Sequence, residues 1–304
     1  MILKKKIVIF AYGFMGKSVY ESLVKNNKFD IAGVILPNKN SLYTSSIDIK
    51  KSSKNTKTLY SDSKKKIYDF IKFINPDFVI ISTFNKILNK EILELSKFIN
   101  IHHGKLPKQK GRASINWALV MGRNNIFITI HEVNSKLDGG SILSQKKILI
   151  LESDNYLSIQ KKINLYLKSK FVKILIKYMK SKIIFKKNNK NYESWNCSRN
   201  PEDGMINFFD KRKNNLRLIR ALYSKKFGAY CFLKEKKIMV IDAKISKKKF
   251  EGIIPGRITQ INKNGSVECL CSDGPIVINK IIYKNKLIKP AKIIRSTRDT
   301  LLND

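Results

Sequence analysis

Apolar and polar positions in the first 150 residues alternate between two periods. Continuous apolar segments such as 78–82 are typical of strands buried on both faces of a parallel sheet. Segments of this kind, or close to it, predict strands over 6–11, 30–36, 78–82, 98–102, 126–133 and 142–150. Apolar residues with helical spacing predict helices over 17–26, 63–74 and 91–97. Strands that alternate with helices predict a doubly wound, Rossmann-like α/β domain with a mostly parallel sheet.

The pattern changes in the second half of the chain. A long amphipathic helix is predicted over 153–180, followed by a polar stretch rich in Lys and Asn. Beyond it come a helix over 211–223 and, from 228 to 283, short alternating segments broken by Gly-containing turns. We therefore predict a catalytic domain over 1–182, a linker over 183–193 and a small β-rich domain over 194–304.

The charge of the chain opens a nucleic-acid interpretation. Sixty-one Lys and Arg residues against 23 Asp and Glu give a formal net charge of +38, which would attract any polyanion. Only nine of the basic residues are Arg, and the lysines are spread along the whole chain among Asn and Ile. Compositional bias of a genome explains such a spread without a ligand. Phosphate recognition tends to use Arg forks.

Composition also bears on the membrane and metal classes. No apolar run approaches the roughly 18–20 residues of a membrane span, and the basic N-terminus leads into Gly13 without a cleavage-like segment. These features predict a cytosolic protein without a membrane partner. The four cysteines lack metal-ligand spacing, and Cys269-x-Cys271 is not C-x-x-C. We expect free thiols and no metal.

Candidate chemistry gathers where the 98–102 strand ends. Asn100 and His102 are two residues apart, so on a strand both side chains project from one face, at the edge where open α/β sheets bind ligands. Two N–H donors converging there suit the oxyanion of an acyl transfer. Asp138, in an Asp-Gly-Gly turn, is a candidate to orient the imidazole and favour its charged form.

Plainer interpretations exist for each feature. A His at a strand end is more often an ordinary hydrogen-bonded residue, and Asp-Gly-Gly is usually only a turn. Gly13-x-x-Gly16 after the first strand is too short for the dinucleotide fingerprint and lacks the acidic residue expected after it. Nicotinamide binding is therefore disfavoured.

The order and spacing of these residues resemble a known family. Asn100-x-His102, followed by Leu106-Pro107 and then Gly111, is similar to the signature loop of the folate-dependent formyltransferases. The resemblance implies that Asn100 and His102 stabilise the oxyanion, while Asp138 holds His102 and helps to manage protons. It also implies 10-formyltetrahydrofolate as formyl donor and a primary amine as acceptor.

The resemblance extends to both substrate sites. It implies a folate cleft lined by the loop after the fourth strand and by the Asp138 loop, which here comprise Thr83, Phe84, Asn85, Lys86, Ile87, Val133, Asn134 and Leu137. Segments around 9–16 and 111–117 look most like the formyltransferase domain of the bifunctional enzyme that modifies aminoarabinose. They imply an acceptor site at Tyr12, Gly13, Met15, Arg112 and Asn116.

Two acceptors and one non-enzymatic alternative remain open. The Arg199 to Gly204 segment resembles sugar N-formyltransferases, and a nucleotide-linked amino sugar is the leading acceptor. Methionyl-tRNA is the alternative, although Leu36 to Tyr43 contains no Arg or Gly where the tRNA enzymes carry a basic loop. An RNA-binding protein on a retired scaffold is the third hypothesis, and the intact Asn, His and Asp speak against it.

Overall fold

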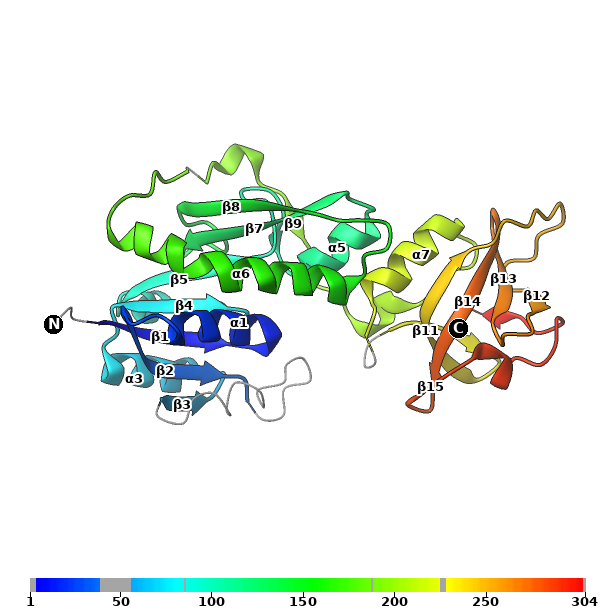
Figure 1. The fold of residues 1–304 in the computed structure, drawn as a ribbon, viewed down its shortest axis with the longest axis horizontal. Coiled ribbons are helices and arrows are strands. Elements are labelled where there is room, and N and C mark those ends of the chain that lie inside the picture. The colour runs from blue at the N-terminus through cyan, green and yellow to red at the C-terminus, as the bar shows by residue number, and fades with distance from the viewer. Residues whose placement is uncertain (1–3, 39–55, 85, 187, 225–227, 303–304) are drawn as a thin grey trace. The chain divides into compact units, whose positions relative to one another are not determined.

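A computed structural model describes residues 4–38, 56–84, 86–186, 188–224 and 228–302, which form two compact units (Figure 1). The N-terminal unit comprises the chain to Ser114, Asn125–Leu149 and Gln160–Cys197. The C-terminal unit comprises Ile115–Asn124, Ile150–Ile159 and the chain from Ser198 onward. The predicted domain boundaries around a 183–193 linker stay a prediction.

The N-terminal unit is built on one sheet with the strand order β3-β2-β1-β4-β5-β7-β8. Its strands are β1 (Lys5–Ala11), β2 (Phe29–Leu36), β3 (Lys57–Tyr60), β4 (Phe78–Ser82), β5 (Lys97–His102), β7 (Asn125–Glu132) and β8 (Ile142–Leu149). The first five are parallel, whereas β7 runs antiparallel to β5 and to β8. The predicted α/β class with a mostly parallel sheet is confirmed.

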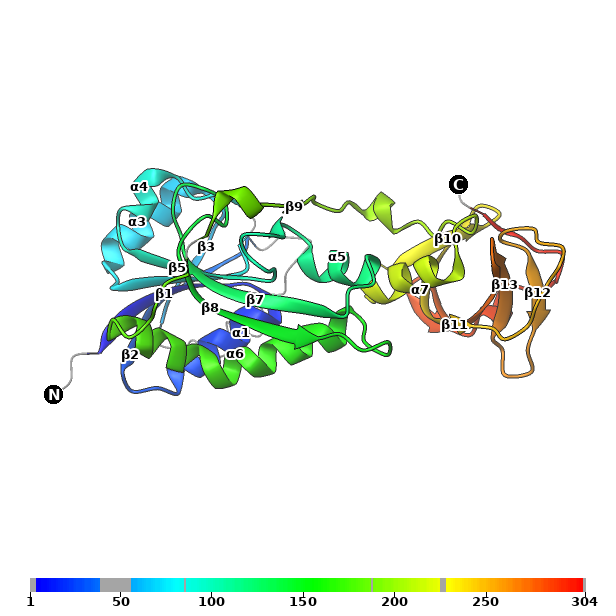
Figure 2. The same cartoon turned by 90° about the horizontal axis from the view of Figure 1, so that it is seen from above.

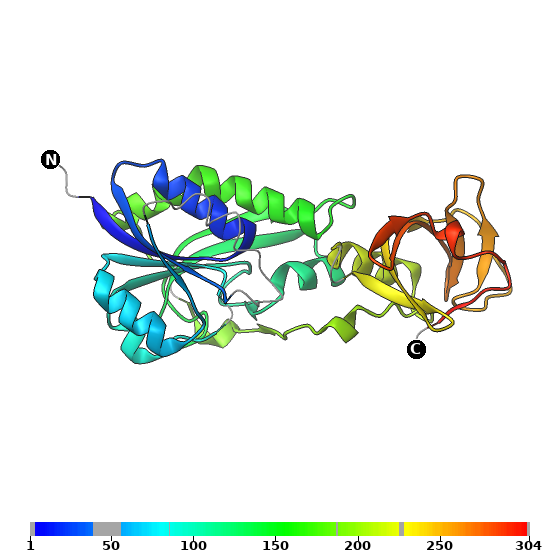
Figure 3. The ribbon, with the colours of Figure 1, turned by 90° about the horizontal axis from the view of Figure 1, so that it is seen from below.

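Helices cover both faces of this sheet. Helices α1 (Gly13–Val24) and α6 (Tyr156–Met179) lie on one face, and α3 (Lys64–Ile74) and α4 (Lys90–Leu93) lie on the other (Figures 2 and 3). Successive residues of β1 serve the two faces in turn, and Ile7, Val8, Ile9 and Phe10 are all fully buried. This double burial is the physical reason for the continuous apolar pattern of the central strands.

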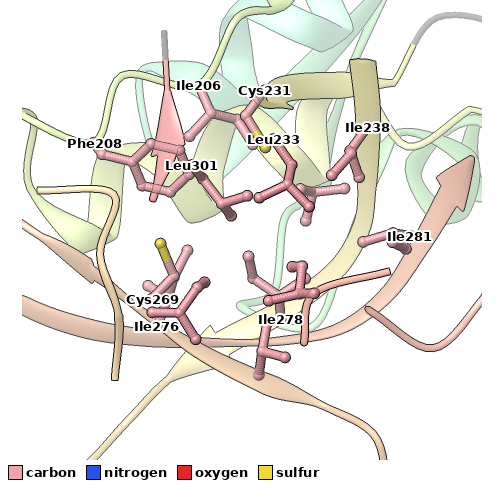
Figure 4. Packing of buried hydrophobic residues seen from close by; sticks show 14 of the residues in the cluster. Ile206, Phe208, Cys231, Leu233, Ile238, Cys269, Ile276, Ile278, Ile281 and Leu301 are labelled. Atoms are coloured by element: carbon pink, nitrogen blue, oxygen red, sulfur yellow. The ribbon is translucent and has the colours of Figure 1, made fainter. Parts of the chain in front are cut away.

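The C-terminal unit is a curled antiparallel sheet with the order β12-β13-β14-β11-β10-β16, and β15 pairs with β14. The strands are β10 (Ala229–Leu233), β11 (Lys236–Ile245), β12 (Ile258–Ile261), β13 (Val267–Cys271), β14 (Gly274–Tyr283), β15 (Lys286–Ile288) and β16 (Leu301–Leu302). Helix α7 (Arg212–Ala221) packs on β11 and β14, and Phe208, Cys231 and Cys269 lie in an apolar core (Figure 4). The predicted β-rich C-terminal domain is confirmed.

The remaining elements are short. They are α5 (Ser114–Val120), β6 (Lys110–Gly111), β9 (Trp195–Asn196) and the 3₁₀ turns η1 (Lys190–Tyr192), η2 (Pro201–Gly204) and η3 (Pro290–Lys292). Strands β6 and β9 pair in parallel. This pairing ties the loop after β5 to a segment more than 80 residues later, which the spacing of apolar residues does not predict.

Two predicted helices differ from the structure, and one strand was not predicted. Helix α1 begins at Gly13 rather than at 17, and the predicted 91–97 helix is shortened to Lys90–Leu93 because Lys97 already belongs to β5. Strand β3 was not predicted, since its Lys-Thr-Leu-Tyr sequence has only partly buried side chains and therefore little apolar signal.

Candidate active site

A cavity of about 490 Å³ lies at the carboxyl ends of β4 and β5. One part of its lining is apolar and includes Ile81, Phe84 and Val133; another part is polar and includes Asn100 and His102. The position is the one at which open α/β sheets bind ligands. A mixed lining with a few converging polar groups is typical of small-molecule sites of this size.

The structure brings Asn100, His102 and Asp138 together in this cavity. Asn100 and His102 come from β5, and Asp138 comes from the loop after β7. His102 Nδ1 lies 3.5 Å from Asp138 Oδ2, and Asn100 Nδ2 lies 3.5 Å from Asp138 Oδ1. The Gly111 amide also donates to Asp138 Oδ2, at 3.0 Å. The carboxylate therefore has a hydrogen bond from the backbone and two polar side chains beside it.

A third histidine, which sequence reasoning missed, belongs to the same cluster. His131 on β7 stands opposite Asn100 in the antiparallel register, with its Nε2 3.1 Å from Asn100 Nδ2 and 3.6 Å from Asp138 Oδ1. Its rarity was a usable signal, because the chain has only three histidines. The β5–β7 pairing was needed to place it.

The contacts of His131 show which Asn100 hydrogen is available. His131 Nδ1 lies 2.7 Å from the Glu132 carbonyl oxygen, which can only accept, so Nδ1 carries the hydrogen. In the neutral ring Nε2 then accepts one N–H of Asn100. The second N–H of the Asn100 amide makes only the long 3.5 Å approach to Asp138. That hydrogen is the one Asn100 can offer to a substrate oxygen.

His102 is held through both ring nitrogens. Its Nε2 lies 2.7 Å from the Gln109 carbonyl oxygen and donates to it, which leaves Nδ1 facing Asp138. Burial lowers the pKa of His102, and the negative charge of Asp138 opposes this only in part. Sequence reasoning expected Asp138 to favour the charged imidazole, but burial outweighs the carboxylate, so the neutral ring is favoured.

The carboxylate of Asp138 keeps its charge in the same surroundings. Burial by itself raises the pKa of Asp138, but protonated forms of the His131 and His102 rings, together with the Gly111 amide, lower it further than burial raises it. The net direction is down. A neutral His102 Nδ1 beside an ionised carboxylate is a site that can accept a proton and share it with Asp138.

Backbone geometry around the cavity is unusual. The non-glycine residues Thr83, Gln109, Ala113 and Asp138 have φ values of 69°, 61°, 55° and 48°, in the left-handed region. At Gly104 an added Cβ would collide with His102 Nε2 and lie 2.5 Å from the Gln109 carbonyl oxygen. A side chain at 104 would therefore break the contact that fixes the His102 ring.

Most of the predicted folate residues line this cavity. They are Thr83, Phe84, Lys86, Ile87, Val133, Asn134 and Leu137. Asn85 lies outside the described residues. Lys86 Nζ donates to the Asp62 carbonyl oxygen at 3.3 Å, so this side chain is anchored at the cavity rim. The binding role of the set stays a prediction.

The predicted acceptor residues divide into two groups. Met15 and Arg112 line the cavity, with Met15 Sδ 2.7 Å from His103 Nε2. Tyr12, Gly13 and Asn116 are not among the lining residues. Tyr12 is buried and donates to Asp62 Oδ1 at 3.1 Å, and Gly13 begins α1. Asn116 belongs to the C-terminal unit, where its amide donates to the Ala221 carbonyl oxygen at 2.8 Å.

Among the described residues, no group of three or more His, Cys, Asp or Glu side chains is arranged to hold a metal ion. None of the helices in the described ranges is long and apolar enough to cross a membrane.

Family models and curated relatives match both units. A model described as "Formyl transferase" matches residues 5–175, and one described as "Formyl transferase, C-terminal domain" matches residues 199–298. The bifunctional polymyxin resistance protein ArnA of Wigglesworthia glossinidia brevipalpis is 30% identical over 268 residues, covering 84% of this chain and 40% of that relative. A methionyl-tRNA formyltransferase of Malacoplasma penetrans is 28% identical over 290 residues, covering 93% of this chain and 90% of that relative.

A solved structure with the same fold is an N-formyltransferase from Helicobacter canadensis in complex with folinic acid and dTDP-3-aminofucose. It has a TM-score of 0.67 and 19% identity, covering 91% of this chain and 99% of that chain. At this identity the likeness is one of fold.

Proposed function

The chain belongs to the formyl transferase family, and on that premise we propose that it moves a formyl group from 10-formyltetrahydrofolate to the amino group of a nucleotide-linked amino sugar. The resemblance seen in the signature loop is thereby confirmed, and so is the expectation of a folate-dependent transferase at the level of the family. The acceptor and the roles of individual residues are the proposed part.

The observation that carries the proposal is the convergence of Asn100, His102 and Asp138 in one cavity. The cavity also fits the donor. Its apolar side can accept a flat ring system, and its volume of about 490 Å³ is in the range of small-molecule sites. When bound there, 10-formyltetrahydrofolate supplies a formyl carbon open to attack by an amine.

Each of the three residues has a role that follows from its contacts. Asn100 donates its second N–H to the formyl oxygen as that oxygen gains negative charge. His102 accepts at Nδ1 the proton that the attacking amine must lose, directly or through a water, and can return it to the folate nitrogen when the bond between that nitrogen and the formyl carbon breaks. Asp138 stabilises that proton on His102 and keeps the ring oriented.

The amino-sugar acceptor is supported by the resemblance of segments 9–16 and 111–117 to the aminoarabinose-modifying enzyme and by Met15 and Arg112 in the cavity lining. A guanidinium such as that of Arg112 suits a nucleotide phosphate. The Leu36 to Tyr43 stretch, most of which lies outside the described residues, contains no Arg or Gly of the kind expected of a tRNA-binding loop. A cytosolic location stays a prediction.

Formylation of methionyl-tRNA is the second candidate, favoured by two observations. The net charge of +38 would attract a polyanion, and the Malacoplasma penetrans relative matches along 93% of the chain.

The two candidates are separated by their products. The full chain is incubated with 10-formyltetrahydrofolate and either a panel of nucleotide-linked amino sugars or charged methionyl-tRNA, and formylated product is detected by mass spectrometry. We expect product with an amino sugar, at a rate that depends weakly on salt. Product with methionyl-tRNA alone, at a rate that falls steeply with salt, would replace the first candidate by the second. Binding of tRNA without product from either acceptor would favour the RNA-binding alternative.

A further inference from the structure

The second half of the predicted 183–193 linker and the three residues after it make specific contacts with the active-site loops. Residues 188–196, here called the strap, run past both the loop that carries Asp138 and the loop that follows β5. All of these residues belong to the N-terminal unit. The composition of this stretch, rich in Lys and Asn, suggested only a solvated connection.

Asn188 holds the Asp138 loop at one end of the strap. Its Nδ2 donates to the carbonyl oxygens of Asp138, at 2.7 Å, and of Gly140, at 3.2 Å. Asp138 has a φ of 48°, a conformation that a non-glycine residue keeps only when its surroundings fix it. At Gly140 any Cβ would collide with the Glu132 carbonyl oxygen, so this loop is packed tightly against β7. One amide thus bridges both sides of the turn that presents the carboxylate.

The other end of the strap holds the loop after β5. The Lys110 amide donates to the Ser194 carbonyl oxygen at 2.9 Å, and the Gln109 amide donates to Ser194 Oγ at 3.1 Å. Lys110 is buried, and its Nζ lies 2.6 Å from Glu193 Oε1. A buried cation with one anionic partner at this distance strongly restricts the relative position of the two segments that carry them.

These two attachment points bear on the same pair of side chains. Gln109 supplies the carbonyl that accepts from His102 Nε2, and the neighbouring Gly111 amide donates to Asp138 Oδ2. Asn188 fixes the backbone of Asp138 itself. The strap therefore contacts both the loop that orients His102 and the turn that presents Asp138.

We infer that the strap is a positioning element for the reaction, in which Asn188 and the Glu193–Lys110 pair set the approach of Asp138 to His102. The inference rests on the catalytic roles proposed above. None of the strap residues is among those lining the cavity, so they act through Asp138 and the β5 loop. A displacement of about 1 Å at such a pair can cost roughly 10²-fold in rate.

The test compares Asn188→Leu with Asn191→Leu in the full chain. Both remove one amide from the same segment, but the Asn191 side chain is exposed and makes none of these contacts. For Asn188→Leu we expect kcat to fall about 10–100-fold while both Michaelis constants stay within roughly threefold. The pKa that governs the pH profile should fall, because Asp138 moves away from the imidazole whose pKa it raises. Asn188→Gln, which keeps the donor, should recover part of the rate.

A second readout does not need the acceptor. Hydrogen exchange at the amides of 109–111 and 138–140 should speed up in Asn188→Leu and stay parental in Asn191→Leu. If the parent formylates no amine, the proposed function fails, yet exchange still decides whether the strap holds these loops. The inference is overturned if Asn188→Leu matches Asn191→Leu in kcat, pH profile and exchange. Loss of rate in step with thermal stability, with an unchanged pH profile, would reduce the strap to an ordinary structural element.

Discussion

Two buried clusters of the molecule contain titratable groups, and they differ in what surrounds those groups. In the N-terminal unit His102 and Asp138 lie among polar partners. In the core of the C-terminal unit Cys231 and Cys269 lie among apolar side chains (Figure 4). Burial raises the pKa of Cys231 to about 12, which keeps the thiol protonated and unreactive.

Burial alone keeps a titratable group in its neutral, unreactive form, whereas polar partners can keep a buried group ionised. Asp138 keeps a lowered pKa although it is largely out of water, because the Gly111 amide and, when they are protonated, the His131 and His102 rings offset the cost of desolvation. The thiols receive no comparable help, although Cys269 Sγ donates to the Gly256 carbonyl oxygen. Substitutions in the first cluster should therefore affect turnover, and substitutions in the second should affect stability.

The largest effect is expected at His102. In His102→Asn the side chain can still donate a hydrogen bond, but it can no longer accept a proton at the Nδ1 position. We expect kcat to fall 10³-fold or more, about 4 kcal/mol, with thermal stability close to parental. Steady-state formyl transfer and thermal unfolding are measured on the same preparation. If the variant unfolds at a much lower temperature than the parent, His102 contributes to stability, as the core residues of the C-terminal unit do.

The matching experiment in the other cluster is Phe208→Ala. Phe208 is 1% exposed in the apolar core of the C-terminal unit. Removing its ring should lower the free energy of unfolding of that unit by about 3–5 kcal/mol, measured by denaturant titration of the full chain. The turnover of the molecules that remain folded should stay within about twofold of the parent. Lost turnover without lost stability would show that the core of the C-terminal unit also affects catalysis.

A smaller effect is expected from pH at His103. Burial lowers the pKa of His103 to about 4, against 6.5 in the unfolded chain. Between these values the unfolded state binds more protons, so stability falls as pH drops from about 6.5 to 4, by roughly 3 kcal/mol. His103→Gln should flatten this part of the stability profile of the N-terminal unit. An equally steep profile in the variant would assign the proton uptake to other groups.

The smallest effects are expected at the cysteines. Cys197 is exposed, whereas Cys231, Cys269 and Cys271 are buried, and burial raises the pKa of each of those three. A maleimide at neutral pH should label the folded chain once, at Cys197, and the remaining thiols only after unfolding. Cys197→Ser should change the free energy of unfolding by less than about 0.5 kcal/mol. A second rapid label on the folded chain would show that at least one of the buried thiols is reactive.

Much of the fold could be predicted because the central strands are largely apolar. That pattern located β1, β2, β4, β5, β7 and β8 to within a residue or two. It did not reveal that β7 runs antiparallel to β5, because strand direction leaves no trace in burial. His131 was missed for this reason, since only the β5–β7 pairing brings it to Asn100.

The site could be predicted only in part, and the reasons are physical. Asn100 and His102 were found because a strand places residues two apart on one face. Tyr12 and Asn116 hydrogen-bond to Asp62 and to the Ala221 carbonyl oxygen and do not line the cavity, so their role in acceptor binding stays a prediction. The protonation state of His102 depends on how deeply its ring is buried, and burial cannot be derived from the identity of the residue alone. The strap was not predicted because its contacts, such as that of Asn188 with Asp138, join residues that are 50 positions apart in the sequence.

Asn100→Ala removes the second N–H that Asn100 is proposed to donate to the formyl oxygen in the transition state. Turnover with the identified acceptor and the dissociation constant for the folate are measured side by side. We expect a fall in kcat of about 10²–10³, or roughly 3–4 kcal/mol, with folate affinity and Michaelis constants within about threefold of the parent. Turnover at the parental rate would mean that Asn100 does not stabilise the developing oxyanion, however closely the loop resembles the family.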